Sequence, residues 1–461
     1  MDTNSEKVRA HEDREQEIMA GKYWIETFGC QMNALDSEKI AGDFQRHGMT
    51  TAVDIDDADV VVLNTCSVRD RAVQKAYARL GELKRRKVAR PDMTVCVVGC
   101  MAQLEGEKII RRAPYVNIVA GPQKGHVIGD LVERSRQSKV PLLELRNDAE
   151  PSPLENDHIL RDTAWRASVT ISEGCSRRCA FCVVPTTRGP ERHREAAGIL
   201  DEVGELAGKG CQEILLLGQT VNSYVDPTDA SIGFAELLRR MTEIDGLRRI
   251  RFTSPHPNYF TDDLLEVMSS HPVICNQIHL PVQSGSTKIL RSMRRGYTRE
   301  SYLEIVRRIR ESTRDIAIST DLIVGYPGET EADFQDTLTL LDAVQYESAF
   351  SFKYSPRPHT SACELVDDVD EQEKGRRLTI LQSRQREIQY ERNATWVGRT
   401  VEVMVESNAR SRVRLTGRTT ENKIVNFDGP DVLIGSFAQV KITGSSPNSL
   451  KGNWIQEHEK S

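Results

Sequence analysis

The stretch Glu173-Gly174-Cys175-Ser176-Arg177-Arg178-Cys179-Ala180-Phe181-Cys182 carries three cysteines on one short loop. An apolar, strand-like run, Ala167 to Ile171, leads into it. Zinc sites commonly use four ligands in two separated pairs, whereas a C-x3-C-x2-C loop supplies three thiolates and leaves one iron of a cubane cluster open to an exogenous ligand. The spacing therefore favours a 4Fe-4S cluster over a chance group of buried thiols.

Composition narrows the class of protein. The chain has 461 residues, of which 38% are hydrophobic and 28% charged, enough for about three domains, each with its own core. Met1 to Ala20 reads as a solvated, charged tail, and no apolar run approaches a membrane span. Ten cysteines predict a reducing compartment, the cytoplasm. Because the net charge is −6, RNA contact would need local basic runs such as Lys84 to Lys87 or Arg291 to Arg295.

Residues 21 to 140 alternate short β-branched runs with helical periodicity, which predicts an amino-terminal open parallel α/β domain. Cys30, Cys66 and Cys100 each follow one of these strands, and the carboxyl ends of parallel strands share one edge of a sheet. We therefore expect the three thiols to converge, either as a second iron cluster or as separate buried thiols. Cys96, inside a strand, is expected in the core. The predicted strands are Tyr23 to Thr27, Val60 to Leu63, Thr94 to Val98 and Asn117 to Ala120.

Residues 141 to 163 are rich in Pro, Asp, Glu and Asn and predict a linker. From 164 to 394, six strand-like runs alternate with helical segments, as in a central partial (β/α)6 barrel with its site at the carboxyl ends of the strands. A charged helix, Asp370 to Ala394, leads out of this barrel. The predicted strands are Ala167 to Ile171, Glu213 to Leu217, Arg249 to Thr253, Asn276 to Leu280, Ala317 to Val324 and Ala349 to Tyr354.

Polar loops follow the second, third and fourth predicted barrel strands. One such loop alone is also typical of an ordinary turn, but several on one barrel face indicate a ligand site. The candidates for holding the amino acid part or ribose of a cofactor are Gln219, Asn222, His279, Gln283 and Ser284. No general acid or base is indicated.

Residues 395 to 458 form short alternating runs separated by glycines, which predicts a carboxyl-terminal small antiparallel β-barrel. Alternate arginines on one strand face the same side and can meet phosphates together, which favours RNA binding over protein docking. The arginines concerned are Arg410, Arg412, Arg414 and Arg418, and the predicted strands are Val397 to Val405, Arg412 to Thr416, Lys423 to Phe427 and Ala438 to Thr443.

Three segments carry a family resemblance. The cysteine loop with Phe181 resembles the radical S-adenosylmethionine (SAM) superfamily. Gly29 to Asn33 and Asn64 to Arg69 resemble the amino-terminal domain of the radical SAM methylthiotransferases, and the last domain resembles the TRAM module of that family. The resemblance extends from Lys22 to about Trp454. Two departures are His193, where the family often has Ser, and His359, where it often has Gly.

The resemblance implies a role for each cysteine group. Cys175, Cys179 and Cys182 would hold the 4Fe-4S cluster that binds and cleaves SAM. Cys30, Cys66 and Cys100 would hold an auxiliary 4Fe-4S cluster that supplies sulfur. Phe181, beside the last cysteine, and the segment with Asp321 and Gly325 would help to bind SAM. The implied reaction uses two molecules of SAM, one as methyl donor and one as the source of a 5'-deoxyadenosyl radical.

Within the family, the Gln-Met-Asn and Cys-Ser-Val-Arg segments are most similar to the branch that methylthiolates carbon 2 of N(6)-dimethylallyladenosine beside the anticodon of tRNA. The implied partners are tRNA, a flavodoxin-like reductant protein and an iron-sulfur or sulfur supply, with the chain acting as a monomer away from membranes. Two alternatives remain open. One is a methylthiotransferase for threonylcarbamoyladenosine in tRNA or for a ribosomal protein, and the other is a non-enzymatic RNA-binding iron-sulfur protein.

Overall fold

The computed structural model describes residues 21–68, 70–146, 158–408 and 415–456. It divides into two compact units, one formed by residues 1–162 with 186–188 and one by 163–185 with 189–461. The tail predicted for Met1 to Ala20 lies outside the described residues. No helix in the described ranges combines the length and the apolar character that crossing a membrane would require.

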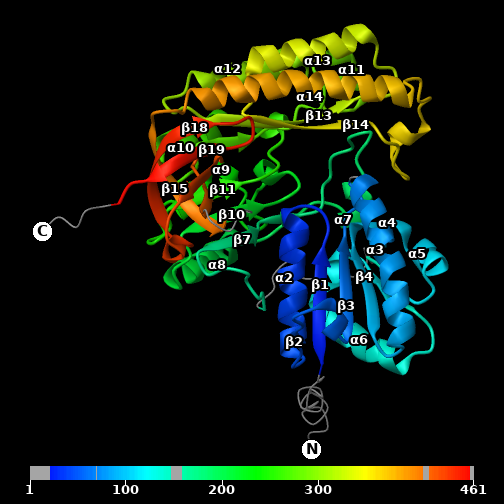
Figure 1. Ribbon diagram of the computed structural model, residues 1–461. Coiled ribbons are helices and arrows are strands. Elements are labelled where there is room, and N and C mark those ends of the chain that lie inside the picture. Colours follow the sequence, from blue (N-terminus) through cyan, green and yellow to red (C-terminus); the bar gives the residue numbers. More distant parts are fainter. Residues whose placement is uncertain (1–20, 69, 147–157, 409–414, 457–461) are drawn as a thin grey trace, which may run out of the picture. The chain divides into compact units, whose positions relative to one another are not determined.

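The first unit is built on a parallel sheet of six strands in the order β2-β1-β3-β4-β5-β6 (Figure 1). Alternate residues of β3 face opposite layers: Val61 packs with helix α3, and Val62 with α2 and α6. Since helices cover both faces, the central strands are hydrophobic throughout. The strands are β1 (Lys22–Thr27), β2 (Thr50–Thr51), β3 (Val60–Thr65), β4 (Thr94–Gly99), β5 (Ile118–Ala120) and β6 (Leu142–Glu144).

The helices of this unit follow the strands as the periodicity predicts. They are α2 (Gln31–Arg46), α3 (Asp70–Ala89), α4 (Cys100–Glu105), α5 (Glu107–Arg112) and α6 (Ile128–Gln137). Cys96 is fully buried in the layer that contacts α2 and α6, which confirms its predicted place in the core.

The start of the predicted linker is wrong. Leu142–Glu144 forms β6, which pairs in parallel with β5 and completes the sheet edge. The Leu160 backbone N–H donates to the Glu38 carbonyl at 3.2 Å, so the chain again lies against α2 before this unit ends. A strand of three residues is too short to show alternation, which explains why its sequence resembles a linker. Residues 147–157 lie outside the described part.

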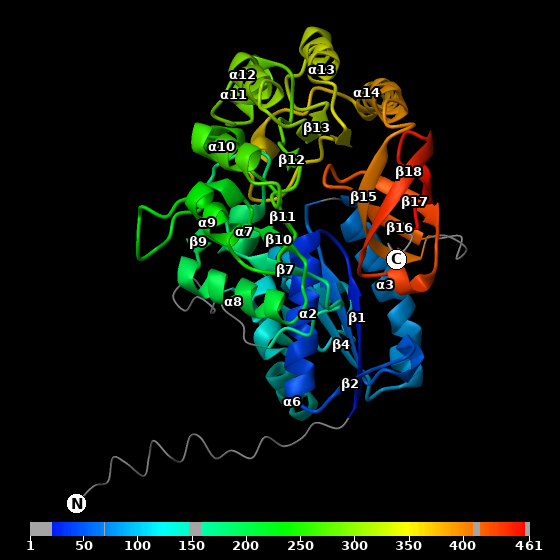
Figure 2. The same cartoon turned by 90° about the vertical axis from the view of Figure 1, so that its left-hand side faces the viewer.

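The second unit contains a partial barrel of six strands in chain order (Figure 2). Two parallel three-stranded sheets, β7-β10-β11 and β12-β13-β14, are joined by a parallel bridge between Ile250 and Ile274. All six predicted barrel strands are present. They are β7 (Arg166–Thr170), β10 (Glu213–Leu217), β11 (Arg249–Phe252), β12 (Gln277–His279), β13 (Ala317–Val324) and β14 (Ser348–Lys353), and a small hairpin joins β8 (Ser172–Glu173) to β9 (Arg192–His193).

Helices surround this barrel and bury one large apolar core against its strands. The helix predicted for Asp370 to Ala394 is α14, and the Asp370 carboxylate caps its first turn by accepting from the Gln372 and Glu373 N–H groups. The helices are α7 (Val184–Arg188), α8 (Ala196–Gly208), α9 (Phe234–Met241), α10 (Asp262–Ser270), α11 (Thr287–Ser292), α12 (Arg299–Arg310), α13 (Glu331–Val344) and α14 (Glu371–Ala394).

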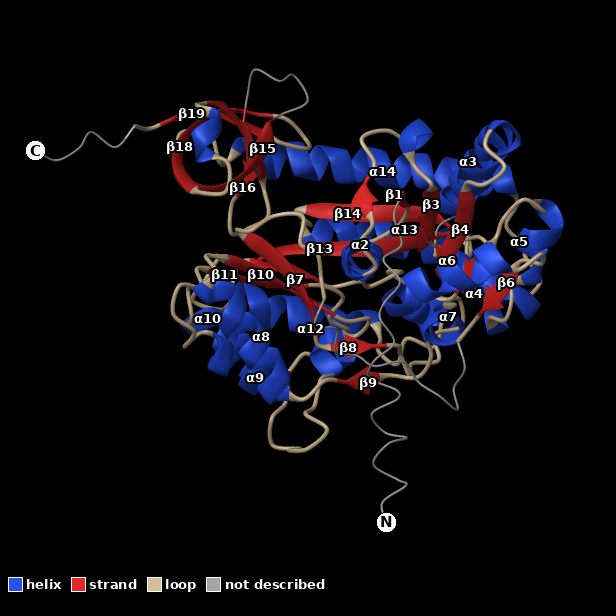
Figure 3. Cartoon of the chain, turned by 90° about the horizontal axis from the view of Figure 1, so that it is seen from below, coloured by secondary structure: helices blue, strands red, loops and turns tan. Residues whose placement is uncertain are grey.

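A closed five-stranded barrel in the order β15-β16-β17-β19-β18 ends the second unit (Figure 3). Four pairings are antiparallel as expected, but β17 and β19 pair in parallel, and β19 is absent from the predicted strands. The parallel pair arises because β19 inserts between β17 and β18 and closes the sheet. The strands are β15 (Thr400–Asn408), β16 (Leu415–Arg418), β17 (Ile424–Asp428), β18 (Phe437–Ser445) and β19 (Leu450–Trp454).

Two buried arginines of β11 attach this small barrel to the larger one. Arg251 donates to the Thr419 and Thr420 carbonyls at 2.7 and 3.1 Å and to the Glu213 carboxylate at 3.1 Å. Arg249 donates to the Arg418 carbonyl at 2.7 Å. Guanidinium groups held by backbone oxygens on a partner domain fix its orientation, because each bond depends on geometry as well as charge.

Candidate metal centres and cofactor site

The loop with Cys175, Cys179 and Cys182 leaves the carboxyl end of β7 through the β8 hairpin. Gly174 begins it with φ +79°, and a Cβ there would lie 2.1 Å from the Pro190 carbonyl oxygen, so this entry requires glycine. The Arg177 N–H donates to the Cys175 sulfur at 3.4 Å, and the Thr220 hydroxyl lies 3.5 Å from the same sulfur. These neighbours hold the Cys175 thiol at the end of the barrel strands.

The three thiols of this loop lie close enough to affect one another's ionisation. Burial raises the pKa of the Cys182 thiol to about 12, and Cys179 and Cys175 add to the rise. Burial also raises the pKa of Cys175. Such thiols remain protonated at neutral pH unless iron displaces the protons, so cluster binding is coupled to proton release.

The loop rests on a small apolar cluster inside the barrel. Ala180 and Phe181 pack against Met293, Tyr326 and Ile323. The Ala180 N–H also donates to the Met293 carbonyl at 2.9 Å, which ties the loop to the end of α11. Phe181, a predicted cofactor-binding residue, therefore lines the apolar wall beside the thiols.

Four of the eight predicted cofactor-binding residues lie on the surface that faces this loop. Phe181 is one. His279 and Asp321 lie on neighbouring strands with their side chains 3.4 Å apart, on the strand face that carries Ile323. Gln219 directly precedes Thr220, and both polar atoms of its carboxamide are buried without a hydrogen-bond partner among the described residues. A buried carboxamide with unsatisfied donors and acceptor is costly unless a ligand completes it, which makes Gln219 a candidate ligand-binding residue.

The other four predicted residues are engaged in internal structure. The Asn222 carboxamide bonds the His256 N–H at 2.7 Å and its carbonyl at 3.0 Å, joining two loops. Gln283 adopts φ +77° and extends the pairing of β13 through its backbone. The Ser284 hydroxyl accepts from the Ser286 N–H at 3.2 Å. Gly325 makes room for the Lys374 side chain, which a Cβ would approach to 2.3 Å.

His359, which stands where the family often has Gly, lies in a turn with an unusual backbone conformation. This residue has φ +65°, the left-handed region that glycine adopts without strain. The family preference for Gly therefore reflects the turn, and His359 fits the same turn at a local steric cost.

Strand register brings the amino-terminal cysteines together. Thr65 and Gly99 are paired residues of β3 and β4, so Cys66 and Cys100 leave the sheet next to each other. Gly29, with φ +130°, precedes Cys30, and a Cβ on it would lie 2.8 Å from the Cys66 Cβ. Cys30, Cys66 and Cys100 therefore lie close together at one edge of the sheet, as predicted from the sequence.

Hydrogen bonds of two asparagines, Asn33 and Asn64, stabilise the sheet edge where these cysteines lie. The Asn33 amide donates to the Asn64 side-chain oxygen at 3.1 Å and to the Thr65 carbonyl at 3.0 Å. The Asn64 amide returns a bond to the Asn33 carbonyl at 2.8 Å and one to the Ser37 hydroxyl at 2.9 Å. These bonds fix the start of α2, whose N-cap is Cys30, against the end of β3, which carries Cys66.

Burial raises the pKa of the Cys100 thiol to about 11, and the nearby Cys66 and Cys30 add to the rise, whereas the charge of Arg188 acts against it. Arg188 is itself buried and pairs with Asp36 at 2.5 Å. The three thiols thus share one electrostatic environment.

Each cysteine group offers three thiols as possible metal ligands. In the described ranges, no three His, Cys, Asp or Glu side chains are grouped to hold one metal ion. In a cubane each thiolate binds a different iron, so its ligands lie further apart than those of a tetrahedral ion. The donor sets, three thiols in each group, match iron-sulfur chemistry.

The predicted RNA contacts are only partly testable in this structure. Arg410, Arg412 and Arg414 lie outside the described residues. Arg418 lies on β16, and its guanidinium contacts the Asn422 side chain at 3.0 Å and Glu406 at 3.4 Å. Of the two basic runs, Arg86 pairs with Asp56 and Arg295 is buried, whereas Lys84, Arg85, Arg291 and Arg294 are exposed.

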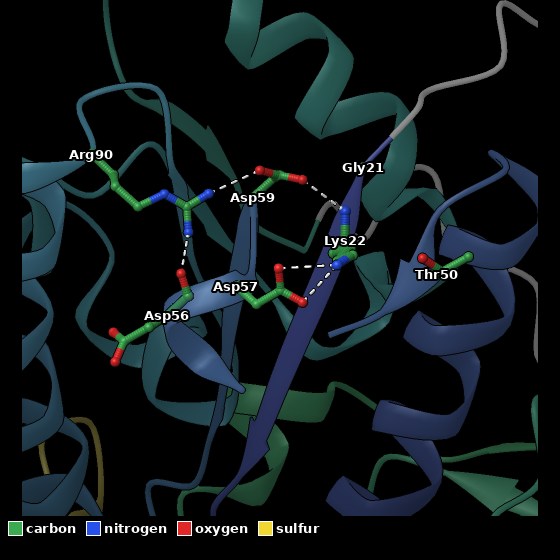
Figure 4. A pocket seen from close by; sticks show the side chains of 7 residues that line it. All are labelled: Gly21, Lys22, Thr50, Asp56, Asp57, Asp59 and Arg90. Atoms are coloured by element: carbon green, nitrogen blue, oxygen red, sulfur yellow. Dashed lines mark hydrogen bonds and ion pairs between the residues drawn. The ribbon is translucent and has the colours of Figure 1, made fainter. Parts of the chain in front are cut away.

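A cavity of about 380 Å³ lies at the amino ends of β1 and β3, where Asp59 precedes β3. Figure 4 shows Lys22 turned toward Asp57 and Arg90 toward Asp59, at 2.7 and 2.9 Å. Lys22 and Arg90, the basic residues that line the cavity, are thus paired with aspartates of its wall, and none of the predicted site residues lines the cavity. The cysteines lie at the other ends of these strands.

Sequence reasoning missed the residues that support the two cysteine groups. In the sequence, Asn33 and Asn64 stand out only as parts of the family motifs, and Arg295 only as part of a basic run. Their position in the sequence was the available signal. A polar residue directly beside a cysteine motif or a strand end needs a specific partner if folding buries it.

Comparison with known proteins identifies the parts of the chain. Residues 22–121 match the uncharacterized protein family UPF0004, 169–341 the radical SAM superfamily and 394–455 the TRAM domain. Radical SAM membership implies a 4Fe-4S cluster and SAM as cofactors. The solved structure of the radical S-adenosylmethionine methyltransferase TsrM from Kitasatospora setae, with tryptophan substrate and a SAM analog, superposes with a TM-score of 0.53 at 16% identity, covering 74% of this chain and 75% of that one. That likeness concerns the fold alone.

Full-length relatives are considerably more similar. The tRNA-2-methylthio-N(6)-dimethylallyladenosine synthase of Koribacter versatilis (strain Ellin345) is 46% identical over 437 residues, 94% of this chain and 98% of the relative. The protein of the same name from Solibacter usitatus (strain Ellin6076) is 46% identical over 439 residues, again 94% and 98% of the two chains. The chain therefore belongs to the tRNA-2-methylthio-N(6)-dimethylallyladenosine synthase family of radical SAM enzymes.

Proposed function

We propose that this chain replaces the hydrogen on carbon 2 of N(6)-dimethylallyladenosine, beside the anticodon of tRNA, with a methylthio group. The observation that carries the proposal is near-complete alignment at 46% identity with synthases of that name, through all three domains. The TRAM barrel supports tRNA as the substrate, with Arg410, Arg412, Arg414 and Arg418 as proposed contacts.

We further propose that Cys30, Cys66 and Cys100 bind a second 4Fe-4S cluster. This proposal is supported by the convergence of three thiols from three strand ends, where hydrogen bonds between Asn33 and Asn64 hold the chain in place. When bound, the barrel's cluster with SAM supplies a 5'-deoxyadenosyl radical, and the second cluster supplies the sulfur.

The chain's own side chains position and shield this chemistry. Gln219, in the loop after β10, His279, at the end of β12, and Asp321, within β13, offer polar groups to SAM. Phe181, Ile323 and their apolar neighbours exclude water from the wall beside the cysteine loop, which protects a reactive radical from side reactions. We assign no general acid or base, since carbon 2 is not activated by proton transfer.

Our proposals about the enzyme's location, its protein partners and its oligomeric state follow from this function. We propose that the enzyme works in the cytoplasm, together with its tRNA substrate. The need for electrons and sulfur predicts a flavodoxin-like reductant protein and an iron-sulfur or sulfur supply, and we propose that the chain works as a monomer.

The proposal is tested with anaerobically reconstituted protein, SAM, a reductant and two tRNA substrates, one with N(6)-dimethylallyladenosine and one with threonylcarbamoyladenosine. Mass spectrometry of the nucleosides is expected to find the methylthio product only from the first. A product only from the second, or only on a ribosomal protein supplied in the same assay, would assign the chain to another branch. Absence of SAM cleavage by cluster-loaded protein would favour a non-enzymatic RNA-binding protein.

A further inference from the structure

Arg295 is a buried cation, and among the described residues none of the three hydrogen-bond partners of its guanidinium is a carboxylate. It follows α11 and is 6% exposed. Its guanidinium donates to the Cys179 sulfur at 3.3 Å, the Tyr297 hydroxyl at 2.9 Å and the Pro281 carbonyl at 3.0 Å. By comparison, Arg194, Arg251 and Arg377, buried in the same unit, each contact a glutamate.

The structure holds Arg295 in place from both sides. Its backbone carbonyl accepts from the Arg177 guanidinium at 3.0 Å, and Arg177 belongs to the cysteine loop itself. The Tyr297 hydroxyl that Arg295 contacts donates to the Val282 carbonyl at 2.9 Å. The guanidinium is therefore pre-positioned toward the Cys179 sulfur by groups on the loop and on the end of β12.

A cation in such surroundings needs an anion nearby, because loss of hydration is not repaid by neutral partners alone. Three thiolates bound to a 4Fe-4S core carry a net negative charge, and reduction adds an electron. Net charge and hydrogen bonds to the sulfurs are among the factors that set the reduction potential of such clusters. Arg295 supplies both a positive charge and a hydrogen bond at one ligand sulfur.

We propose that Arg295 is the counter-charge of the barrel's cluster and raises its reduction potential by stabilising the reduced state. A one-electron protein reductant then loads the single electron that reductive cleavage of SAM consumes. Arg295 acts through Cys179 and is a positioning residue. The inference rests on the barrel cluster that family membership implies and does not depend on which tRNA is the substrate.

The test uses full-length protein with Cys30, Cys66 and Cys100 replaced by Ala, so that one cluster gives the electron paramagnetic resonance signal. The ratio of reduced to oxidised cluster is followed in a redox titration without tRNA. Arg295→Gln and Arg295→Met remove the charge, and Arg295→Lys keeps it. Arg294→Met is the matched control, since Arg294 is the exposed neighbour and carries the same charge in water.

In both neutral variants we expect the ratio at a fixed potential to fall about tenfold, equivalent to a midpoint about 59 mV lower for a one-electron couple. Arg295→Lys and Arg294→Met should stay within about twofold of the parent, as expected for retained or screened charge. An unchanged midpoint in an iron-loaded neutral variant overturns the proposal. If the neutral variants fail to load iron, loading of Arg295→Lys supports a need for the charge, whereas its failure assigns Arg295 a purely structural role.

Discussion

The two cysteine groups reach similar donor sets by opposite routes. In the barrel unit, Cys175, Cys179 and Cys182 share one loop, whose shape depends on Gly174 and a few local bonds. In the first unit, Cys30, Cys66 and Cys100 come from three strand ends and meet only because the sheet is in register. A local site withstands distant changes, whereas an assembled site depends on the stability of its whole domain.

The groups also differ in the charge beside them. Arg188, near Cys100, is neutralised by its pair with Asp36, whereas Arg295, at Cys179, has no carboxylate hydrogen-bond partner in the part of the chain that the structure describes. A positive charge favours the more negative, reduced form of a cluster. Under our proposals, this contrast favours electron uptake at the barrel's site, because the Arg188–Asp36 pair adds no net charge beside Cys100.

The largest expected effect comes from the barrel loop. Replacing Cys175, Cys179 and Cys182 by Ala should abolish SAM cleavage, because no iron remains to bind SAM, and should lower the iron content from about eight to about four per chain. Iron analysis and chromatographic detection of 5'-deoxyadenosine measure both. If the wild type saturates at four irons, the two sites do not both hold clusters.

A second prediction concerns the asparagine that supports the assembled site. Asn64→Ala removes the acceptor of Asn33 and two donated bonds inside a buried network, which should destabilise the first unit by about 2 kcal/mol. We expect loss of the iron bound by Cys30, Cys66 and Cys100, while SAM cleavage continues. Denaturant unfolding and iron content check this.

The matched control is Asn222→Ala, since Asn222 joins two loops of the barrel in the same way. It should slow SAM cleavage and leave the first unit's iron unchanged. Equal loss of iron from both units in either variant would contradict the contrast between a local and an assembled site.

A smaller effect follows from His256, next to the barrel's loops. Burial, with the charges of Arg295 and Arg177, lowers the pKa of this histidine to about 2. The unfolded chain takes up a proton near its ordinary value of about 6.5. The associated stability is thus present above that pH and is lost as pH falls toward 2, by at most about 1.4 kcal/mol per pH unit.

The check for His256 is a comparison of unfolding free energies between pH 7 and 4.5 for the wild type and His256→Gln. The variant should lose this part of the acid dependence in the barrel unit. Identical slopes for the two proteins would show that His256 does not remain neutral in the folded state.

The sequence allowed much of this fold to be predicted because long buried strands and charged helices have clear periods. The buried barrel strands β10 and β13 are examples, and α14 is predicted from the helical spacing of Leu378, Leu381 and Ile388. The edge strand β6 has only three residues and is too short to show a period, whereas β19, Leu450–Trp454, has Gly452 at its centre between two polar residues and therefore resembles a turn. The grouping of the cysteines could be predicted, since three share one loop and three follow the ends of parallel strands.

The contacts of the side chains around the cysteine groups could not be predicted in the same way. Arg295 occurs in a run of arginines that resembles a phosphate-binding surface, and only folding shows that its side chain turns inward to Cys179. Asn222 and Ser284 have the polarity of ligand contacts but satisfy backbone groups instead. Residue type gives bonding capacity, whereas the choice of partner depends on tertiary contacts.

The most direct test replaces Cys30, Cys66 and Cys100 by Ala and follows 5'-deoxyadenosine and methylthiolated nucleoside in one assay. We predict that SAM cleavage continues, because it depends on a loop in the other unit, and that the methylthio product disappears. If these cysteines were only core thiols, the small cavities would cost on the order of 1 kcal/mol each and the product would still form. A folded triple variant that still methylthiolates tRNA would contradict the role assigned to the first unit.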